Sequence, residues 1–295
     1  MERIKFITDT ASDIPDEYLT KYSEIELLSF PIAVDGREYL ERKSFTIEEY
    51  YPILNNAREI PVTSRIPLTD FLASYQAALD EGYRHGIVVT INAGGSGTFT
   101  SAAMARDLFY EKNPGAREAM EIHLVDSRTY TMAYGYPIVE SVKMARAGAG
   151  VREILDYLED WVDCVEVLLG CYTLEFAKKS GRIPAAAAFV GDVLGLRPVI
   201  LMVDGQTKTI EKVRGDKNLT KRLYAHYQNS RTGPDEPVFI VRSEPDEPVE
   251  DLQRMFEADI GRRVPVFRTG AAVLTNTGTK IVAIVSKNAR RHPGK

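Results

Sequence analysis

The chain has 295 residues, carries a formal net charge of -5 at pH 7 and is 44% hydrophobic. This length and apolar content suffice for two hydrophobic cores, so we expect two domains. The acidic balance argues against a nucleic-acid-binding protein, which usually carries a basic excess. Apolar runs stay shorter than the roughly 18 residues that a membrane-spanning helix needs. We therefore expect a cytoplasmic protein with no nucleic-acid partner and no integral membrane segment.

Disulfide and metal sites are not expected from the sequence. Cys164 and Cys171 form no C-x-x-C pair, and we interpret them as small buried apolar residues. Histidine, cysteine and carboxylate residues do not gather at ligand spacing along the chain. The sequence therefore predicts no metal ion and no cofactor.

The first half, residues 1–165, is predicted to be a Rossmann-like α/β domain with a parallel sheet. Apolar β-branched runs alternate in it with helix-forming stretches, the pattern of a sheet covered by helices. Thr46 and Glu49 have the spacing of a capping box, and Thr69 is expected to cap another helix. The predicted strands cover residues 3–7, 87–91 and 121–125, a hairpin turns at Asp35-Gly36, and helices cover residues 15–22, 46–57, 69–81, 98–112, 129–147 and 151–165.

The second half, residues 166–295, is predicted to be another α/β domain with a mixed or antiparallel sheet. The dipeptide Asp204-Gly205 between two β-rich runs is a strong hairpin signal. The predicted strands cover residues 167–169, 198–203, 209–213, 238–241, 264–267 and 281–285, and the helices cover residues 174–179, 184–196, 219–228 and 249–259.

Residues 85–102 have the order strand, glycine turn, helix. Gly94, Gly95 and Gly97 let backbone N–H groups approach a ligand, and the start of the next helix adds partial positive charge. Such a turn suits an anion, either a phosphate or a carboxylate. It lacks the lysine of a phosphate loop and the G-x-G-x-x-G spacing of a dinucleotide site, so the pattern does not favour a nucleotide.

Small polar residues follow three of the predicted strands, at Thr8-Asp9-Thr10, residues 92–98 and Asp126-Ser127. In an open parallel sheet these strand ends share one edge, where ligands bind. Thr63-Ser64 adds two hydroxyls in a proline-held extended loop, which suits a carboxylate held by hydrogen bonds. Ser96 lacks the second glycine of a G-x-S-x-G elbow, so we expect no hydrolase triad.

Six motifs in chain order resemble the DegV family of fatty-acid-binding proteins, acyl carriers that present a fatty acid to a fatty acid kinase. The resemblance covers nearly the whole chain. The matching strings are T-D-T-A-S-D-I-P at 8–15, Thr63-Ser64 with Pro67, S-G-T at 96–98 with Ser101-Ala102, Asp126-Ser127-Arg128, L-E-F-A-K-K-S-G-R-I at 174–183, and V-L-G-L-R-P-V-I at 193–200 with Asp204-Gly205.

The resemblance implies that a long-chain fatty acid is buried between the two domains, with its carboxylate hydrogen-bonded at their junction. It also implies that the protein is a carrier and not an enzyme, and that a fatty acid kinase partner phosphorylates the exposed carboxyl. Thr63 is the strongest implied carboxylate ligand. The complete expected set is Thr63, Ser64, Asn92, Ser96, Gly97 and Asn276.

The chain departs from the family pattern at two of these positions. Asn92-Ala93 stands where the family usually has paired serines before the glycine turn. Asn276 stands where the family often has a histidine, and the G-P-G that follows there is absent. Asparagine can donate to a carboxylate but cannot carry a positive charge, so head-group recognition is expected to differ.

Two other functions stay open at this point. One is an enzyme acting on a small carboxylated or phosphorylated metabolite at the same sheet edge, with Asp9, Asp126 or His123 as its acid or base. The other is a regulatory or structural protein that retains only a relic of the pocket.

Overall fold

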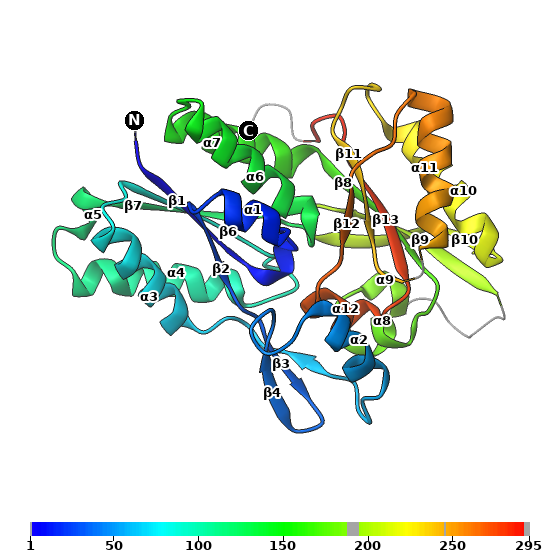
Figure 1. Cartoon of the computed structure of the whole chain (residues 1–295), viewed down its shortest axis with the longest axis horizontal. Coiled ribbons are helices and arrows are strands. Elements are labelled where there is room, and N and C mark those ends of the chain that lie inside the picture. The colour runs from blue at the N-terminus through cyan, green and yellow to red at the C-terminus, as the bar shows by residue number, and fades with distance from the viewer. Residues whose placement is uncertain (1, 188–194, 245, 292–295) are drawn as a thin grey trace.

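The structure, a computed structural model, describes residues 2–187, 195–244 and 246–291. Two larger sheets lie side by side, the first built from the N-terminal half and the second from the C-terminal half, and a small third sheet lies below them in Figure 1. Helices cover the sheets, so the predicted α/β class is confirmed. The smaller helical elements are a 3-10 turn (Thr10–Ser12), α1 (Asp16–Lys21), α5 (Ala116–Ala119), α8 (Glu175–Ser180) and α9 (Pro184–Ala187).

The first sheet is wholly parallel, with the strand order β2-β1-β6-β7. All six residues of β1 are buried, as expected for a strand that is covered on both faces. Figure 1 shows α3 and α4 on one side of this sheet and α6 and α7 on the other. These elements are β1 (Ile4–Asp9), β2 (Ile25–Leu28), β6 (His85–Thr90), β7 (Glu121–Asp126), α3 (Leu68–Asp80), α4 (Thr98–Lys112), α6 (Met132–Arg146) and α7 (Val151–Cys164).

The second sheet is mixed, with the strand order β10-β9-β8-β13-β11-β12. Its pairings are antiparallel except that of β11 with β12. Its strands are β8 (Val165–Cys171), β9 (Leu196–Val203), β10 (Gln206–Arg214), β11 (Val238–Arg242), β12 (Val266–Arg268) and β13 (Ile281–Lys287). Helices α10 (Asp216–Ser230) and α11 (Glu247–Ile260) cover its outer side in Figure 1.

The third sheet pairs segments of the first half but packs on a helix from the far end of the chain. Its strands are β3 (Pro31–Val34), β4 (Arg37–Leu40) and β5 (Val62–Thr63), and α2 (Ile47–Asn55) lies beside them. Helix α12 (Ala271–Thr277), which the sequence analysis does not assign, shares their hydrophobic cluster. The Tyr50 and Thr275 hydroxyls lie 2.6 Å apart.

One hydrophobic cluster runs through both halves of the molecule. It includes Phe6 and Ile87 from the first sheet and Val167 and Val241 from the second. Helix α7 ends at Cys164 and β8 begins at Val165, so the chain passes directly from a helix of the first half into the second sheet. The division into domains 1–165 and 166–295 stays a prediction, because the two halves share this core.

Three local expectations need correction. Thr69 does not cap α3: Pro67 occupies the N-cap position, and the Thr69 hydroxyl donates to Asp70 inside the first turn. Helix α6 begins at Met132, not at 129, because Thr131 has a φ of 59°, which is outside helical geometry. The helix expected over 184–196 is described only as α9, since residues 188–194 lie outside the described residues and β9 begins at Leu196.

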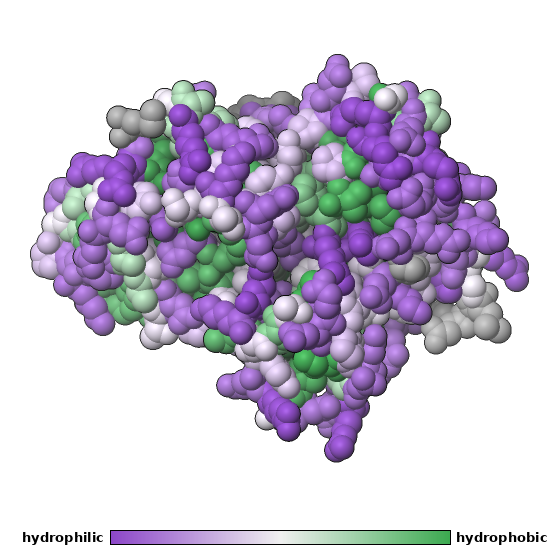
Figure 2. Space-filling model, viewed as in Figure 1, coloured by the Kyte–Doolittle hydropathy of each residue, from purple (hydrophilic) through white to green (hydrophobic). Residues whose placement is uncertain are grey.

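The face of the molecule drawn in Figure 2 is mostly hydrophilic, and hydrophobic side chains form separate patches on it. Large hydrophobic residues with more than a third of their surface exposed are Leu40, Val62, Met104 and Val266 in the described part of the chain. Among the described helices, none combines the length and the apolar character that a membrane crossing demands.

Candidate functional site

A cavity of about 120 Å³ lies where the C-terminal edge of the first sheet faces the second sheet. Strands β8, β9, β11 and β13 give it an apolar wall, and Phe30, Ile91 and Val273 extend that wall. Polar groups gather at its other side. The wall residues on the strands are Val167, Leu169, Met202, Val241, Ile281 and Ala283, and the polar side chains include Thr63, Ser64, Arg65, Ser96, Arg182 and Asn276.

The glycine turn after β6 is held by Asn92. The Asn92 backbone carbonyl accepts from the N–H groups of Gly95 (3.0 Å) and Ser96 (3.1 Å), and its side-chain oxygen accepts from Gly94 N (3.1 Å). A Cβ atom at Gly95 would lie 2.2 Å from the Tyr130 hydroxyl. Glycine is therefore required here for close approach of the turn to Tyr130.

Thr63, Ser96 and Asn276 come from three distant segments and line the same cavity. The Asn276 side-chain amide donates to Thr63 Oγ1 at 3.4 Å and to Ala272 O in its own helix at 2.8 Å. Ser96 Oγ lies 2.9 Å from Thr98 Oγ1, which also accepts from Ile66 N at 3.3 Å. The loop that carries Thr63 is thus fastened to the start of α4.

Five of the six predicted site residues line this cavity: Thr63, Ser64, Ser96, Gly97 and Asn276. Asn92 is not among the described lining residues and is 3% exposed. Its side-chain amide donates to Tyr130 Oη (3.0 Å) and to Gly205 O (2.9 Å). Asn92 therefore fastens the glycine turn to the β9–β10 hairpin of the second sheet.

Two arginines at the cavity are residues that the sequence reasoning missed. Arg65 is exposed and forms no ion pair with any described residue, and its Cδ would lie only 2.9 Å from a Cβ atom at Gly97. Arg182 donates to Gly95 O. Both have a sequence signal, since Arg65 follows Thr63-Ser64 and Arg182 belongs to the 174–183 motif. Their guanidinium groups place positive charge at the cavity, which the uncharged Asn276 does not.

The acid and base candidates of the alternative enzyme are not among the described residues that line the cavity. Burial raises the pKa of Asp9 to about 7, although Tyr134 and Ile91 N–H (2.9 Å) donate to its carboxyl. Asp126 accepts from the Ala93 and Arg128 N–H groups, as a turn residue does. His123 is the third of the six residues of β7 and so lies before the polar end of that strand.

Two further buried carboxyls lie at the start of α12. Asp13 accepts from Gly270 N at 2.9 Å, and Glu41 accepts from Ala272 N at 3.0 Å and from the Thr10 hydroxyl at 2.6 Å. Burial raises the pKa of both carboxyls. They fix α12, and with it Asn276, against the first half of the chain.

Fold and cavity together define the class: an α/β protein of two packed sheets with an apolar pocket at the C-terminal edge of the parallel sheet. A sequence model described as "Uncharacterised protein, DegV family" matches residues 3–288. The chain belongs to the DegV family, and the resemblance noted in the sequence is confirmed.

Individual relatives cover nearly the whole chain. A DegV domain-containing protein of Caldanaerobacter subterraneus is 26% identical over 263 residues, which are 88% of this chain and 89% of that protein. A fatty-acid-binding DegV family protein from Thermus thermophilus has a TM-score of 0.85 at 24% identity, over 97% of this chain and 100% of that one. A stearic-acid-binding protein from Eubacterium ventriosum has a TM-score of 0.85 at 21% identity, over 97% and 98%. These structures share the fold.

Proposed function

We propose that this protein binds one long-chain fatty acid, with the acyl tail against the second sheet and the carboxylate at Thr63, Arg65, Ser96 and Asn276. The observation that carries the proposal is the cavity itself, which joins an apolar wall to a cluster of hydroxyl, amide and guanidinium groups. A molecule that complements it has a long apolar part and one anionic end. Several solved structures of the same fold are described as fatty-acid-binding, which supports this choice.

The acyl tail supplies most of the affinity in this proposal. Burying all 14–16 methylenes of such a tail at about 0.8 kcal/mol each would give a gross term on the order of 10 kcal/mol. The cavity of about 120 Å³ holds only part of such a tail, so in this proposal the apolar wall opens further when the acid binds. The polar groups orient the head group and select a carboxylate. Arg65 attracts it by charge, and Thr63 and Ser96 donate hydroxyl hydrogen bonds. Asn92 acts by holding the turn and not by contact with the ligand.

A carrier role fits these residues better than an enzyme. The acid and base candidates of the enzyme hypothesis do not line the cavity, as described above. Ser64 and Arg65 are exposed beside the proposed carboxylate position. A fatty acid kinase approaching that side would reach the carboxyl while the tail stays buried, so we propose that such a kinase is the partner.

Lipid analysis tests the binding proposal. Protein purified from a bacterial host is denatured and extracted, and the extract is analysed by mass spectrometry. We expect about one fatty acid per chain.

Thr63→Val removes a hydrogen bond to a charged group, so we expect roughly tenfold or greater weakening of fatty acid binding to delipidated protein. Thr69→Val, at an exposed position on α3, is the matched control and should bind normally.

Empty protein that also fails to take up palmitate or oleate would contradict the binding proposal.

The kinase step needs its own assay, in which loaded protein is incubated with ATP and a bacterial fatty acid kinase, and acyl phosphate is measured. Acyl phosphate that forms equally well from free fatty acid would argue against a carrier role. A loaded protein that no kinase accepts would remove the partner proposal and leave the binding proposal standing.

A further inference from the structure

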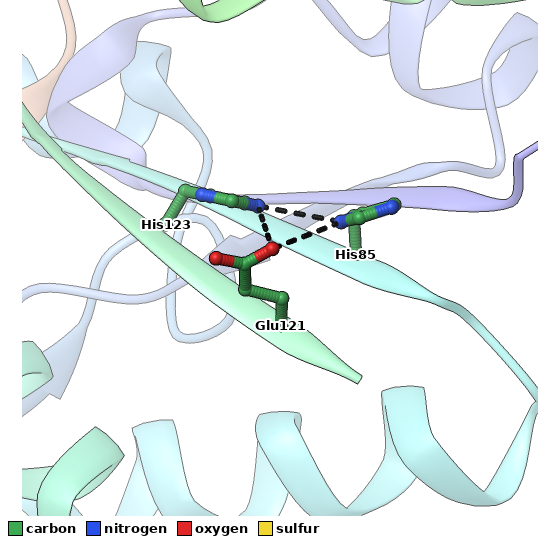
Figure 3. A group of neighbouring side chains, drawn as sticks. All are labelled: His85, Glu121 and His123. Carbon is green, nitrogen blue, oxygen red and sulfur yellow. Dashed lines mark hydrogen bonds and ion pairs between the residues drawn. The ribbon is translucent and has the colours of Figure 1, made fainter. Parts of the chain in front are cut away.

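A cluster of three ligand-type side chains lies at the start of the parallel strands, away from the cavity (Figure 3). His85 is the first residue of β6, and Glu121 and His123 belong to β7. The strand register places His85 beside Glu121 and Ile87 beside His123. Because side chains two residues apart share one face of a strand, the three residues point to the same side.

The ligand atoms have the spacing of a metal site. His85 Nδ1 lies 3.3 Å from His123 Nε2, and Glu121 Oε2 lies 3.6 Å from His123 Nε2 and 4.0 Å from His85 Nδ1. A point equidistant from these three atoms is about 2.1 Å from each, which is the length of a Zn–N or Zn–O bond. An ion at that point would replace the hydrogen bond between the two ring nitrogens and would need no change in the backbone.

A second carboxylate supports the orientation of His85. Glu2 Oε1 lies 3.8 Å from His85 Nε2, the ring nitrogen that faces away from the cluster, and Glu2 Oε2 accepts from Val151 N at 3.1 Å. Histidines that bind metals commonly pair their other ring N–H with a carboxylate, which fixes the ring and its tautomer. Glu2 lies 3.8 Å away, beyond hydrogen-bond distance, and would make this contact after a small side-chain movement; its other oxygen is held by the start of α7.

The side chains of the cluster suit a cation. A neutral imidazole ring, as in His85 and His123, can offer a nitrogen lone pair to a metal ion. Glu121, the most exposed of the three with 61% of its side chain accessible, contributes a negative charge and leaves room for water to complete the coordination.

We propose that His85, Glu121 and His123 bind one Zn²⁺ ion. Two imidazole nitrogens and one carboxylate oxygen favour zinc and similar transition metals over Mg²⁺ and Ca²⁺, which prefer sites made of oxygen atoms. The ion joins β7, one of the two edge strands of the first sheet, to β6. Spacing along the sequence does not reveal the site, because strand pairing brings together residues that lie 36 positions apart.

Zinc titration of protein made without a polyhistidine tag and treated with EDTA tests the proposal. By isothermal calorimetry we expect one Zn²⁺ per chain, with Mg²⁺ and Ca²⁺ giving no signal. The thermal unfolding midpoint should rise with Zn²⁺, because a ligand that binds only the native state stabilises it. Loss of His123 in the variant His123→Gln should weaken zinc binding roughly 100-fold or more.

Two further variants keep the test decisive. Glu121→Gln changes an exposed side chain and should fold even if a histidine variant does not, and it should weaken zinc binding at least about tenfold. His226→Gln, at a histidine paired with Glu211 on the second half, should bind zinc like the parent. Absence of binding at micromolar zinc, or binding that persists unchanged in both cluster variants, would overturn the proposal. Fatty acid content should be the same with and without zinc.

Discussion

Asp9 gives the sharpest quantitative expectation, because its carboxyl is fully buried beneath the site. It accepts from Ile91 N, at the start of the glycine turn, and from the Tyr134 hydroxyl. Burial raises its pKa from 3.8 to about 7. The native state therefore keeps a proton between about pH 4 and pH 7 that the unfolded chain has released. The contribution of Asp9 to stability therefore falls as the pH rises through this range, because at this group the native state binds more protons than the unfolded chain.

The magnitude follows from the pKa. At about 1.4 kcal/mol per pH unit, raising the pKa of Asp9 from 3.8 to about 7 corresponds to about 4 kcal/mol of unfolding free energy. Asp9→Asn resembles the protonated acid: its oxygen can accept from Ile91 N and its amide can donate to Tyr134. We expect the unfolding free energy of the variant, relative to that of the parent, to increase by about 4 kcal/mol as the pH rises from 4 to 8. Asp13 and Glu41 are present in both proteins, so their contributions cancel.

Urea unfolding of delipidated protein across this pH range measures the difference. The single tryptophan, Trp161, is 1% exposed and is a natural fluorescence probe of unfolding. Asp235→Asn removes an exposed loop carboxyl and is the control for the effect of losing one negative charge. Stability curves for Asp9→Asn and the parent that run parallel from pH 4 to pH 8 would refute the reasoning.

Three other changes probe the walls and the turn. Gly95→Ala places a Cβ 2.2 Å from the Tyr130 hydroxyl, so fatty acid affinity measured on delipidated protein should drop about tenfold. In a Tyr130→Phe background the loss of affinity should be smaller. An equal loss there would show that the clash with the hydroxyl is not the cause. Ala283→Phe puts a larger side chain into the cavity at its apolar wall, so mass spectrometry should find shorter acids or less bound acid. An unchanged lipid profile would place the tail elsewhere. Asn92→Ala leaves Gly205 O without its side-chain donor, so chemical unfolding should show a loss of about 1–3 kcal/mol; unchanged stability would mean that the turn is held by other contacts.

The sequence predicts the strand–turn–helix unit at the site because its signals are local. A β-branched run, close glycines and a helix-forming stretch each act within a few residues, and the β6–α4 unit has these elements. The convergence of polar strand ends follows from parallel topology, and β1, β6 and β7 do lie next to one another. The capping box of Thr46 and Glu49 is also present as expected.

Other features depend on contacts between distant segments, which local patterns do not carry. Helix α12 is seven residues long and is stabilised by burial against the third sheet, not by its own propensity. Arg65 and Arg182 line one cavity only because the two halves pack together. Thr69 has the right residue type for a cap. Pro67, two residues earlier, has the extended backbone geometry of an N-cap and occupies that position.

The embedding of α12 among segments from the start of the chain has a consequence for synthesis on the ribosome. Ile32 and Tyr50 share their interior with Leu274, and Asp13 and Glu41 receive backbone donors from Gly270 and Ala272. A nascent chain has made the first set of residues long before the second emerges. Until α12 emerges, these early residues lack their partners, and their apolar side chains and carboxyls stay in contact with water. This part of the growing chain is therefore exposed to aggregation for most of the time between the synthesis of β3 and that of α12.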